Sequence, residues 1–436
     1  MELFGRLERK QFDVAILVHV DFEDETCREE LTEFLELVES AGAEQAELIK
    51  TKRDRPDAKL FIGSGKLDEV AAAVALHQAD VVIFNHALSP GQERNIERVV
   101  KARVIDRVGL ILDIFAQRAR SHEGKLQVEL AQLRHMSTRL VRGWTHLERQ
   151  KGGIGLRGPG ETQLESDKRL LQERIKHLLK RIEKVRKQRA LGRQSRQRSD
   201  HPTITLVGYT NAGKSTLFNQ LTAADVYAEN RLFATLDATL RSVHLPGGGQ
   251  AILADTVGFI RHIPHDLVTA FRSTLEETSE ADLLIHLIDA ADPLRDDKIA
   301  QVQQVIAEVG ATDVPQLLVF NKIDLLQPAV EPHVDFDEEG QPARVWISAQ
   351  NNLGLYYLKD ALASFFKGQF VRIFIKLGAE AGHRRAQLYA LGKVEQEASD
   401  DDGTIGLQVY LTEQQYHQVS KWPECQYIEK LQEAAV

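Results

Sequence analysis

The chain has 436 residues, of which 43% are hydrophobic and 27% charged, and it contains two cysteines. This length suggests about three packed domains, and the composition excludes a disordered, collagen-like or disulfide-stabilised chain. Cys27 and Cys425 form no C-x-x-C pair, which is typical of a reducing compartment and predicts no zinc site. The first residues lack a signal-peptide pattern, and no apolar run approaches the ~20 residues that span a bilayer. We expect a cytoplasmic, monomeric protein that associates with membranes at most peripherally.

The net charge of −9 hides a strongly uneven distribution. Residues 118–198 hold 22 of the 55 Lys and Arg residues but only 8 of the 64 Asp and Glu residues. A basic middle region within an otherwise acidic chain indicates a polyanionic partner, most often a nucleic acid.

The first part of the chain alternates strand-like and helix-like stretches. Residues 14–20 form an apolar run typical of a buried strand, and residues 28–42 have the spacing of an amphipathic helix that ends at a glycine. A strand, a glycine turn and a helix follow over residues 60–78, another strand over 79–85, and residues 102–119 close the region. This alternation predicts a small, mostly parallel α/β layer.

Two long helical stretches make up the basic middle region. Residues 126–144 and 162–199 carry apolar side chains near a spacing of 3.6, and the glycine-dense residues 151–161 between them cannot be helical. The simplest interpretation is a pair of antiparallel helices joined by a glycine-rich loop.

A second α/β run begins near Thr203 and ends near Lys367. Its strand-like stretches are residues 204–210, 251–259, 282–290, 316–324 and 344–349. The remainder, with a strand-like segment at 371–377, a helix-like one at 381–392 and a hairpin near 400–403, predicts a small α+β appendage. The expected domains are residues 1–118, 119–200, 201–368 and 369–436.

The strongest motif fits G-x-x-x-x-G-K-[ST], follows an apolar strand and opens a helix. In this context backbone N–H groups surround phosphates, the lysine reaches the β/γ oxygens, and the serine offers its hydroxyl to Mg²⁺. A plain glycine turn before a surface helix is the less specific interpretation. The residues of this phosphate loop are Gly208, Tyr209, Thr210, Asn211, Ala212, Gly213, Lys214 and Ser215.

A second motif indicates which base is bound. Asp324, at the end of an N-K-x-D stretch, can accept hydrogen bonds from the ring N–H and the exocyclic amine of guanine, whereas adenine would leave a carboxylate unpaired. A Ser-Ala-Gln stretch after the next strand can close over the base edge through backbone N–H groups. The residues expected to contact the base are Asn321, Lys322, Ile323, Asp324, Ser348, Ala349 and Gln350.

Two further stretches fit the γ-phosphate and the metal. Asp255 fits a carboxylate that orients the ligands of Mg²⁺ without binding the metal itself, and the N–H of Gly258 can contact the γ-phosphate. Lys214 and Gly258 are therefore the expected catalytic residues. Thr235 is the candidate for a second Mg²⁺ hydroxyl beside Ser215, with Thr239 as competitor and simple capping as the alternative. These stretches add Phe233, Ala234, Thr235, Leu236 and Asp237, and Asp255, Thr256, Val257 and Gly258, to the expected GTP-binding residues.

The stretches GYTNAGKS, FATLD, DTVGF, NKID and SA, in this order, resemble the five motifs of a translation-factor-class GTPase. The basic helical pair with GGIGLRGPGETQLE and the N-terminal FIGSGKLDEV resemble the HflX family specifically. The resemblance covers the whole chain and is weakest after Lys367. It implies an α/β P-loop GTPase domain preceded by an α/β domain and a helical arm, using Mg²⁺, binding the large ribosomal subunit and splitting stalled ribosomes under stress.

Phe259 stands where many GTPases place a glutamine that orients the attacking water. An aromatic ring can neither donate nor accept in this way, so intrinsic hydrolysis is expected to be slow. Another side chain of the same domain, or a partner, must then position the water.

The Gly63-Ser-Gly65-Lys66 stretch invites comparison with a second nucleotide site. It lacks a full phosphate loop, and a tight turn before a helix is the simpler interpretation. Since related proteins are discussed as binding ATP in this region, a weak ATP site stays open.

We expect the arm to contact ribosomal RNA, although a merely solvated basic face is the alternative. The candidate contacts are Gly153, Gly155, Arg157, Arg181, Lys184 and Lys187. Two other functions are considered: a regulatory GTP switch that acts on a protein or membrane partner, and an ATP-driven RNA remodeller that uses the N-terminal layer through Lys66.

Overall fold

The computed structural model describes residues 14–22, 31–143, 163–197, 201–222, 233, 239–246, 250–260, 278–366, 370–378, 380–400 and 403–431. Contacts divide the chain into two compact units. The first contains residues 1–187 together with 229–237 and 260–272, and the second contains residues 188–228, 238–259 and 273–436.

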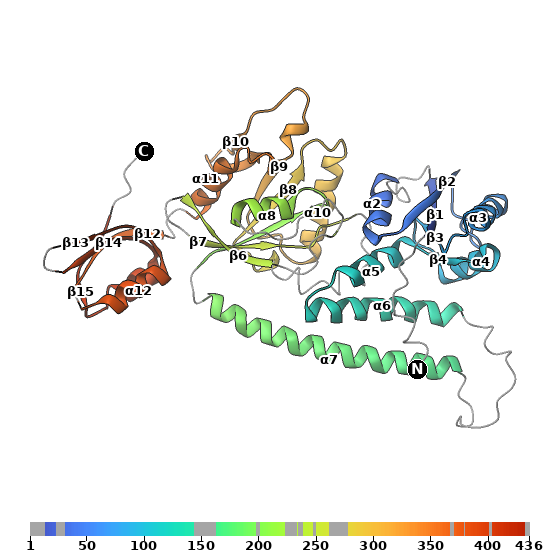
Figure 1. Cartoon of the computed structure of the whole chain (residues 1–436), viewed down its shortest axis with the longest axis horizontal. Coiled ribbons are helices and arrows are strands. Elements are labelled where there is room, and N and C mark those ends of the chain that lie inside the picture. The colour runs from blue at the N-terminus through green and yellow to red at the C-terminus, as the bar shows by residue number, and fades with distance from the viewer. Residues whose placement is uncertain are drawn as a thin grey trace. The chain divides into compact units, whose positions relative to one another are not determined.

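An α/β layer opens the first unit, and its parallel sheet has the order β2-β1-β3-β4. The central strand β1 buries nearly every residue, because a strand covered on both faces needs a continuous apolar run. The elements are β1 (Val14–Phe22), α2 (Leu31–Ala41), β2 (Glu44–Arg53), α3 (Ser64–His77), β3 (Val81–Phe84), α4 (Pro90–Val100), β4 (Arg103–Ile105) and α5 (Arg107–Arg118) (Figure 1).

One predicted strand of this layer is absent. Residues 60–62 form the end of a turn in which the backbones of Asp57 and Phe61 pair, and Phe61 has a left-handed φ of 65°. The apolar side chains that suggested a strand are buried there in the core beside α3. The second strand is instead β2, which is hard to recognise in the sequence because most of its residues are charged or polar.

The basic middle region folds as the predicted helical pair, α6 (His122–Gly143) and α7 (Gln163–Gln197), which run alongside each other (Figure 1). Arg174 pairs with Glu129 and Arg181 with His122, so the helices are antiparallel. Leucines from both helices form their shared core: Leu126, Leu130, Leu133, Leu171 and Leu178. The loop over residues 151–161 lies outside the described residues.

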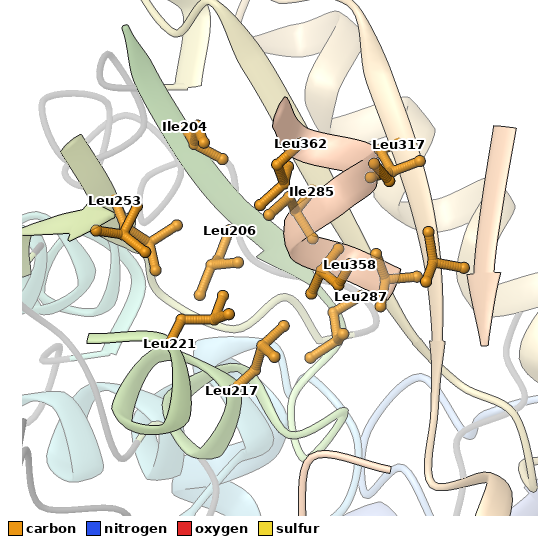
Figure 2. Packing of buried hydrophobic residues seen from close by; sticks show 14 of the residues in the cluster. Ile204, Leu206, Leu217, Leu221, Leu253, Ile285, Leu287, Leu317, Leu358 and Leu362 are labelled. Carbon is orange, nitrogen blue, oxygen red and sulfur yellow. The ribbon is translucent and has the colours of Figure 1, made fainter. Parts of the chain in front are cut away.

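The second unit holds a seven-stranded sheet of order β10-β11-β9-β8-β5-β7-β6. Its five central strands are parallel, and α8 and α11 pack on the core shown in Figure 2. The elements are β5 (Thr203–Gly208), α8 (Lys214–Thr222), β6 (Thr239–His244), β7 (Gln250–Asp255), β8 (Leu283–Asp289), α10 (Arg295–Glu308), β9 (Gln316–Asn321), the short 3₁₀ helix η4 (Ile323–Leu325), β10 (His333–Phe336), β11 (Pro342–Trp346) and α11 (Leu355–Phe365).

The C-terminal residues form a βαββαβ fold of strand order β13-β14-β12-β15, which is ferredoxin-like. The predicted hairpin near residues 400–403 joins β13 to β14. The elements are β12 (Phe370–Leu377), α12 (Gly382–Leu391), β13 (Lys393–Ser399), β14 (Ile405–Thr412), α13 (Glu413–Val419) and β15 (Cys425–Lys430). Within the described parts of the chain, no helix is long and apolar enough to cross a membrane.

Candidate nucleotide site

The phosphate loop connects β5 to α8 at the carboxyl edge of the parallel sheet, where open α/β sheets bind ligands. Gly213 has a φ of +97°, and a Cβ there would lie 2.4 Å from Nδ2 of Asn321. Only glycine fits this position, because both the backbone angle and the neighbouring amide exclude a side chain.

Lys214 is buried inside this loop. Its ammonium group donates to the backbone carbonyls of Gly208 and Tyr209 at 2.9 and 2.8 Å. Burial lowers the pKa of Lys214 to about 8, and the carboxylate of Asp255 partly opposes that shift. Burial, together with the charge of Lys214, lowers the pKa of the neighbouring His286 to about 4, so this imidazole is neutral at physiological pH.

Ser215 and Asp255 lie together beside the loop, with the hydroxyl donating to the carboxylate at 3.1 Å. Asp255 is fully buried at the end of β7. A hydroxyl backed by a carboxylate is a donor set that suits Mg²⁺, which prefers oxygen ligands and keeps several for phosphate and water. Among the described residues there is no cluster of three His, Cys, Asp or Glu side chains able to hold a metal ion without such outside ligands.

The stretch after Asp255 is held against the phosphate loop. Phe259 accepts from the N–H of Thr210 at 2.7 Å and donates its own N–H to the carbonyl of Gly208 at 3.1 Å. A Cβ on Gly258 would lie 2.8 Å from Cγ2 of Thr210 and 3.0 Å from Nζ of Lys214. The ring of Phe259 is 3% exposed, so it is a packed side chain of the site and not a solvent-facing one.

Asn321 links the two halves of the site. Its amide nitrogen donates to the carbonyl of Ala212 in the phosphate loop, and its amide oxygen accepts from the N–H of Ala349, both at 2.9 Å. Asn321 is 3% exposed at the end of β9. One side chain therefore sets the distance between the phosphate loop and the Ser348–Ala349 turn.

The structure brings the N-K-x-D residues to the same sheet edge. Asp324 follows β9 in η4 with an exposed carboxylate, and Gln350 is also exposed. Lys322, in a left-handed backbone conformation, pairs with Asp289 at 2.7 Å. Thr256 and Ile323 are buried, with the hydroxyl of Thr256 donating to the carbonyl of Leu206 at 2.6 Å.

Two charged residues of this site were not predicted from the sequence. Asp289 is the last residue of β8, at the carboxyl edge of the sheet. The available signal in the sequence was a carboxylate at the end of an apolar strand, where ligands bind in such sheets. Lys298 lies in α10, pairs with Asp292 at 2.6 Å and stands 4.8 Å above the ring of Tyr209. Nothing in the spacing of α10 marks Lys298 as part of a nucleotide site.

Several predicted residues lie outside the described part of the chain. Thr235 is among them, so the choice between Thr235 and Thr239 stays a prediction; Thr239 itself begins β6 and is partly buried. Phe233 is described and buried at 3% exposure. The predicted residues without a described position are Ala234, Thr235, Leu236, Asp237, Gly153, Gly155 and Arg157.

The basic arm presents its charges to solvent. Lys176, Lys180, Lys184 and Lys187 are exposed and recur along α7 at nearly helical spacing, while Leu171 and Leu178 are buried against α6. Arg181 is partly buried beside His122. The exposed lysines form one stripe, as a polyanion contact would require.

The Gly63–Lys66 stretch is a turn before α3. Gly63 caps the helix without a side-chain hydrogen bond, and Lys66 pairs with Glu69 of the same helix at 2.8 Å. The preceding strand, β2, ends at Arg53, and the described residues 54–63 form no strand directly before the turn, unlike a βα phosphate loop. The geometry therefore favours the simple turn over a second nucleotide site.

Three family models match consecutive parts of the chain. Residues 28–116 match the GTP-binding GTPase N-terminal model, and residues 118–196 match the GTP-binding GTPase middle-region model. Residues 203–322 match a model described as 50S ribosome-binding GTPase.

The chain is similar to curated proteins over nearly its full length. It is 57% identical to the GTPase HflX of Escherichia coli K12 over 395 residues, 91% of this chain and 92% of that protein. It is 46% identical to the GTPase HflX of Caldanaerobacter subterraneus subsp. tengcongensis over 404 residues, 92% of this chain and 91% of that protein. Among solved structures, a GTP-binding protein of Sulfolobus solfataricus in complex with GDP is 26% identical, covers 81% of this chain and 98% of its own, and has a TM-score of 0.44. The identities to the bacterial proteins show that the chain belongs to the HflX family of GTPases, which hydrolyse GTP.

Proposed function

We propose that the chain is a Mg²⁺-dependent GTPase that binds the large ribosomal subunit through its basic helical arm and separates stalled ribosomes under stress. The lysine stripe on α7 is the observation that carries this proposal, because exposed lysines along one face of a helix can contact the phosphates of folded RNA. The ribosome-binding family model over the GTPase region supports the same partner. A ribosomal partner would place the chain in the cytoplasm.

Guanine selection is assigned to Asp324, whose exposed carboxylate is free to accept from the base edge. The pair formed by Lys322 and Asp289 orients the lysine stem beside the base. Asn321 holds the Ser348–Ala349 turn at the same edge through the N–H of Ala349, and a turn whose position is fixed in advance loses little entropy on binding.

Phosphate binding is assigned to the loop and Lys214. The two carbonyls that Lys214 now contacts are weak partners compared with phosphate oxygens, so a β/γ-phosphate would draw the ammonium away from them. Ser215 and Thr235 would hold Mg²⁺, with Asp255 orienting the Ser215 hydroxyl. When bound, Mg²⁺ neutralises charge on the phosphates.

Hydrolysis is expected to depend on the partner. Phe259 offers no side-chain hydrogen bond to water, and its backbone N–H and C=O are both used by the phosphate loop. A group supplied or ordered on the ribosome would complete the site, and groups of this kind raise GTPase rates by ~10³–10⁵ in other systems.

The experiment that tests the proposal is co-sedimentation with purified ribosomal subunits across a salt series, with a non-hydrolysable GTP analogue or GDP. The variant Lys180→Gln/Lys184→Gln/Lys187→Gln should weaken binding to the large subunit and reduce the slope of log affinity against log salt by up to about 1 for each lost phosphate contact. The matched control replaces three lysines exposed elsewhere, Lys50, Lys59 and Lys421, by glutamine.

Unchanged ribosome binding by the α7 variant at every salt concentration would make the lysine stripe a solvated face and refute the assignment. Preferential binding of the intact protein to anionic liposomes in a parallel arm would support the membrane-switch alternative instead. Subunit separation is measured by light scattering of intact ribosomes after GTP addition.

A further inference from the structure

The C-terminal sheet has two faces of different character. On one face Ile373 and Ile375 of β12 and Val409 of β14 belong to a core shared with α12 and α13. Because successive side chains of a strand point to opposite faces, the alternate residues of both strands lie on the other face. These residues are all partly exposed: Arg372, Phe374, Lys376, Gln408 and Tyr410. One face of the sheet is thus covered by helices, and the other is accessible to a ligand.

Two aromatic rings lie side by side on the accessible face. A Cβ on Gly406 of β14 would lie 3.2 Å from Cζ of Phe374, so glycine lets this ring pack against the backbone of the neighbouring strand. On its other side, β15 places Tyr427 opposite Lys376, and the centroids of the Tyr427 and Phe374 rings are 6.3 Å apart. Tyr427 is 49% exposed. Adjacent strands therefore contribute neighbouring rings to one accessible surface.

The third aromatic ring of this face is paired with a cation. Tyr410 of β14 lies opposite Arg372 of β12, and its ring centroid is 5.8 Å from Cζ of the guanidinium. Arg372 also donates to Oε1 of Gln408 at 2.8 Å, which restrains the guanidinium on the face. Aromatic rings and guanidinium planes are the surfaces on which unpaired bases stack.

The two cations of the accessible face already have carboxylate partners. Arg372 pairs with Glu395 at 2.6 Å, and Lys376 pairs with Asp400 at 3.1 Å. These four charges cancel, which distinguishes the face from the lysine stripe of α7. A ligand of this face must therefore be held mainly by stacking on the rings and only secondarily by charge.

We propose that this face binds single-stranded RNA, whose bases stack on Phe374, Tyr410 and Tyr427. RNA-recognition modules stack bases on aromatic side chains of a four-stranded sheet. Here β12 and β14, the two central strands, carry Phe374 and Tyr410. An acidic peptide would gain little from cations that are already paired, whereas bases need only accessible rings. The choice of RNA as the nucleic acid rests on the proposed ribosomal partner.

The chain would then have two RNA contacts of different physical character. Binding of phosphates by the lysines of α7 weakens steeply as salt rises, whereas stacking on the C-terminal face persists. The C-terminal face would also select unpaired segments, because only bases outside a helix can stack on protein rings.

The test measures binding of the full chain to a short fluorescein-labelled oligouridine RNA by anisotropy. The background variant Lys180→Gln/Lys184→Gln/Lys187→Gln limits the contribution of the arm. In this background Tyr427→Leu should weaken RNA binding at least about five-fold, the lower end of what one stacked base contributes. Phe374→Leu should have an effect of the same size. Photo-crosslinking of bromouridine-substituted RNA, followed by mass spectrometry, should label peptides of β12, β14 or β15.

The matched control is Tyr389→Leu. Tyr389 is 51% exposed in α12, on the helix-covered side of the same domain. Its hydroxyl donates to Glu397 at 2.7 Å, as the hydroxyl of Tyr427 donates to Glu429 at 2.6 Å. The two tyrosines thus match in exposure and hydrogen bonding and differ in the face they occupy, so Tyr389→Leu should leave RNA affinity unchanged.

A second variant tests the charge balance of the face. Glu395→Gln removes the carboxylate partner of Arg372 while the bond to Gln408 remains. RNA binding should become tighter, and the slope of log affinity against log salt should steepen by up to about 0.7, the value for one phosphate contact with a single strand. A merely structural role of Arg372 would not change this slope.

Wild-type RNA affinity in both Tyr427→Leu and Phe374→Leu, with unchanged thermal unfolding, overturns the inference, and so does an equal loss in Tyr389→Leu. Loss of ribosome binding in Tyr427→Leu with RNA affinity intact also overturns it, because the face would then bind a protein. Ribosome co-sedimentation of the arm variant tests the proposed function separately, so the two can fail independently.

Discussion

Replacing Asn321 by alanine should weaken nucleotide binding and lower the stability of the GTPase region, because this buried side chain bonds to both the phosphate loop and the Ser348–Ala349 turn. The change removes a donor from the carbonyl of Ala212 and an acceptor from the N–H of Ala349, both in buried surroundings. Each buried polar group left without a partner costs about 1–3 kcal/mol, so the two together amount to roughly 2–4 kcal/mol after partial solvation. That is a large share of the stability of an ordinary domain.

Two consequences can be measured. In a GTPase region of this size, each kcal/mol of lost stability lowers the melting temperature by roughly 2–4 °C. The melting temperature of this region should therefore fall by about 4–16 °C. GTP and GDP should both bind at least ~10-fold more weakly and by similar factors, because the phosphate loop and the base turn that Asn321 connects serve both nucleotides. Fluorescent-nucleotide titration gives the two dissociation constants.

The matched control is Asn351→Ala in the same turn. Asn351 is exposed and contributes its backbone N–H to Ser348, a bond that alanine retains. Wild-type affinities and melting temperature in Asn321→Ala, or an equal loss in Asn351→Ala, would show that the bridge does not hold the two loops in register.

Three more predictions concern the base, the buried lysine and the aromatic ring. Asp324→Asn should weaken GTP binding severely and favour a xanthine nucleotide, whose exocyclic oxygen accepts where guanine donates; unchanged GTP affinity removes the base assignment. Burial lowers the pKa of Lys214 to about 8, so the folded chain releases this proton at a lower pH than the unfolded chain does. The stability of the nucleotide-free protein should therefore rise by roughly 3 kcal/mol between about pH 8 and 10.5. Denaturant melts of Lys214→Met should lack this increase, and equal pH profiles of stability for the variant and the wild type would contradict it. Phe259→Ala should hydrolyse GTP faster than wild type when free and respond less to the large subunit in single-turnover assays, whereas a wild-type free rate already equal to the ribosome-bound rate would show that the site is complete in one chain.

The sequence was most informative where chemistry and periodicity agree. The phosphate loop, the N-K-x-D stretch and Asp255 each follow an apolar strand, and the parallel sheet brings them to one edge. The antiparallel pairing of α6 and α7 followed from their apolar spacing, since two such stripes bury each other.

Edge strands were harder to predict. β2, β6 and β10 border their sheets and carry charged or polar side chains on much of their length, so no apolar run or clean alternation marks them. Conversely, the apolar residues 60–62 suggest a strand in the sequence. In the structure they belong to a turn that packs Phe61 into the core beside α3. Hydrophobicity reports burial and not backbone conformation.

Within the site, sequence reasoning found the residues of the motifs and missed those that support them. Asp289 and Lys298 act on Lys322 and Tyr209 through contacts between elements distant in the chain. The same holds for the second hydrogen bond of Asn321, which reaches a turn 28 residues further along the chain. Such contacts exist only once the sheet has assembled, and no local pattern encodes them.

The absence of a glutamine at position 259 acquires a different meaning from the geometry. The sequence suggested that Phe259 merely fails to orient water, but its backbone N–H and C=O are both bonded to the phosphate loop. A displacement of Phe259 would therefore break the hydrogen bonds to Gly208 and Thr210 and disturb the loop itself. A partner that stimulates hydrolysis by moving this segment would thus act on the phosphate loop at the same time, whereas a partner that supplies a polar group for the water would leave both bonds in place.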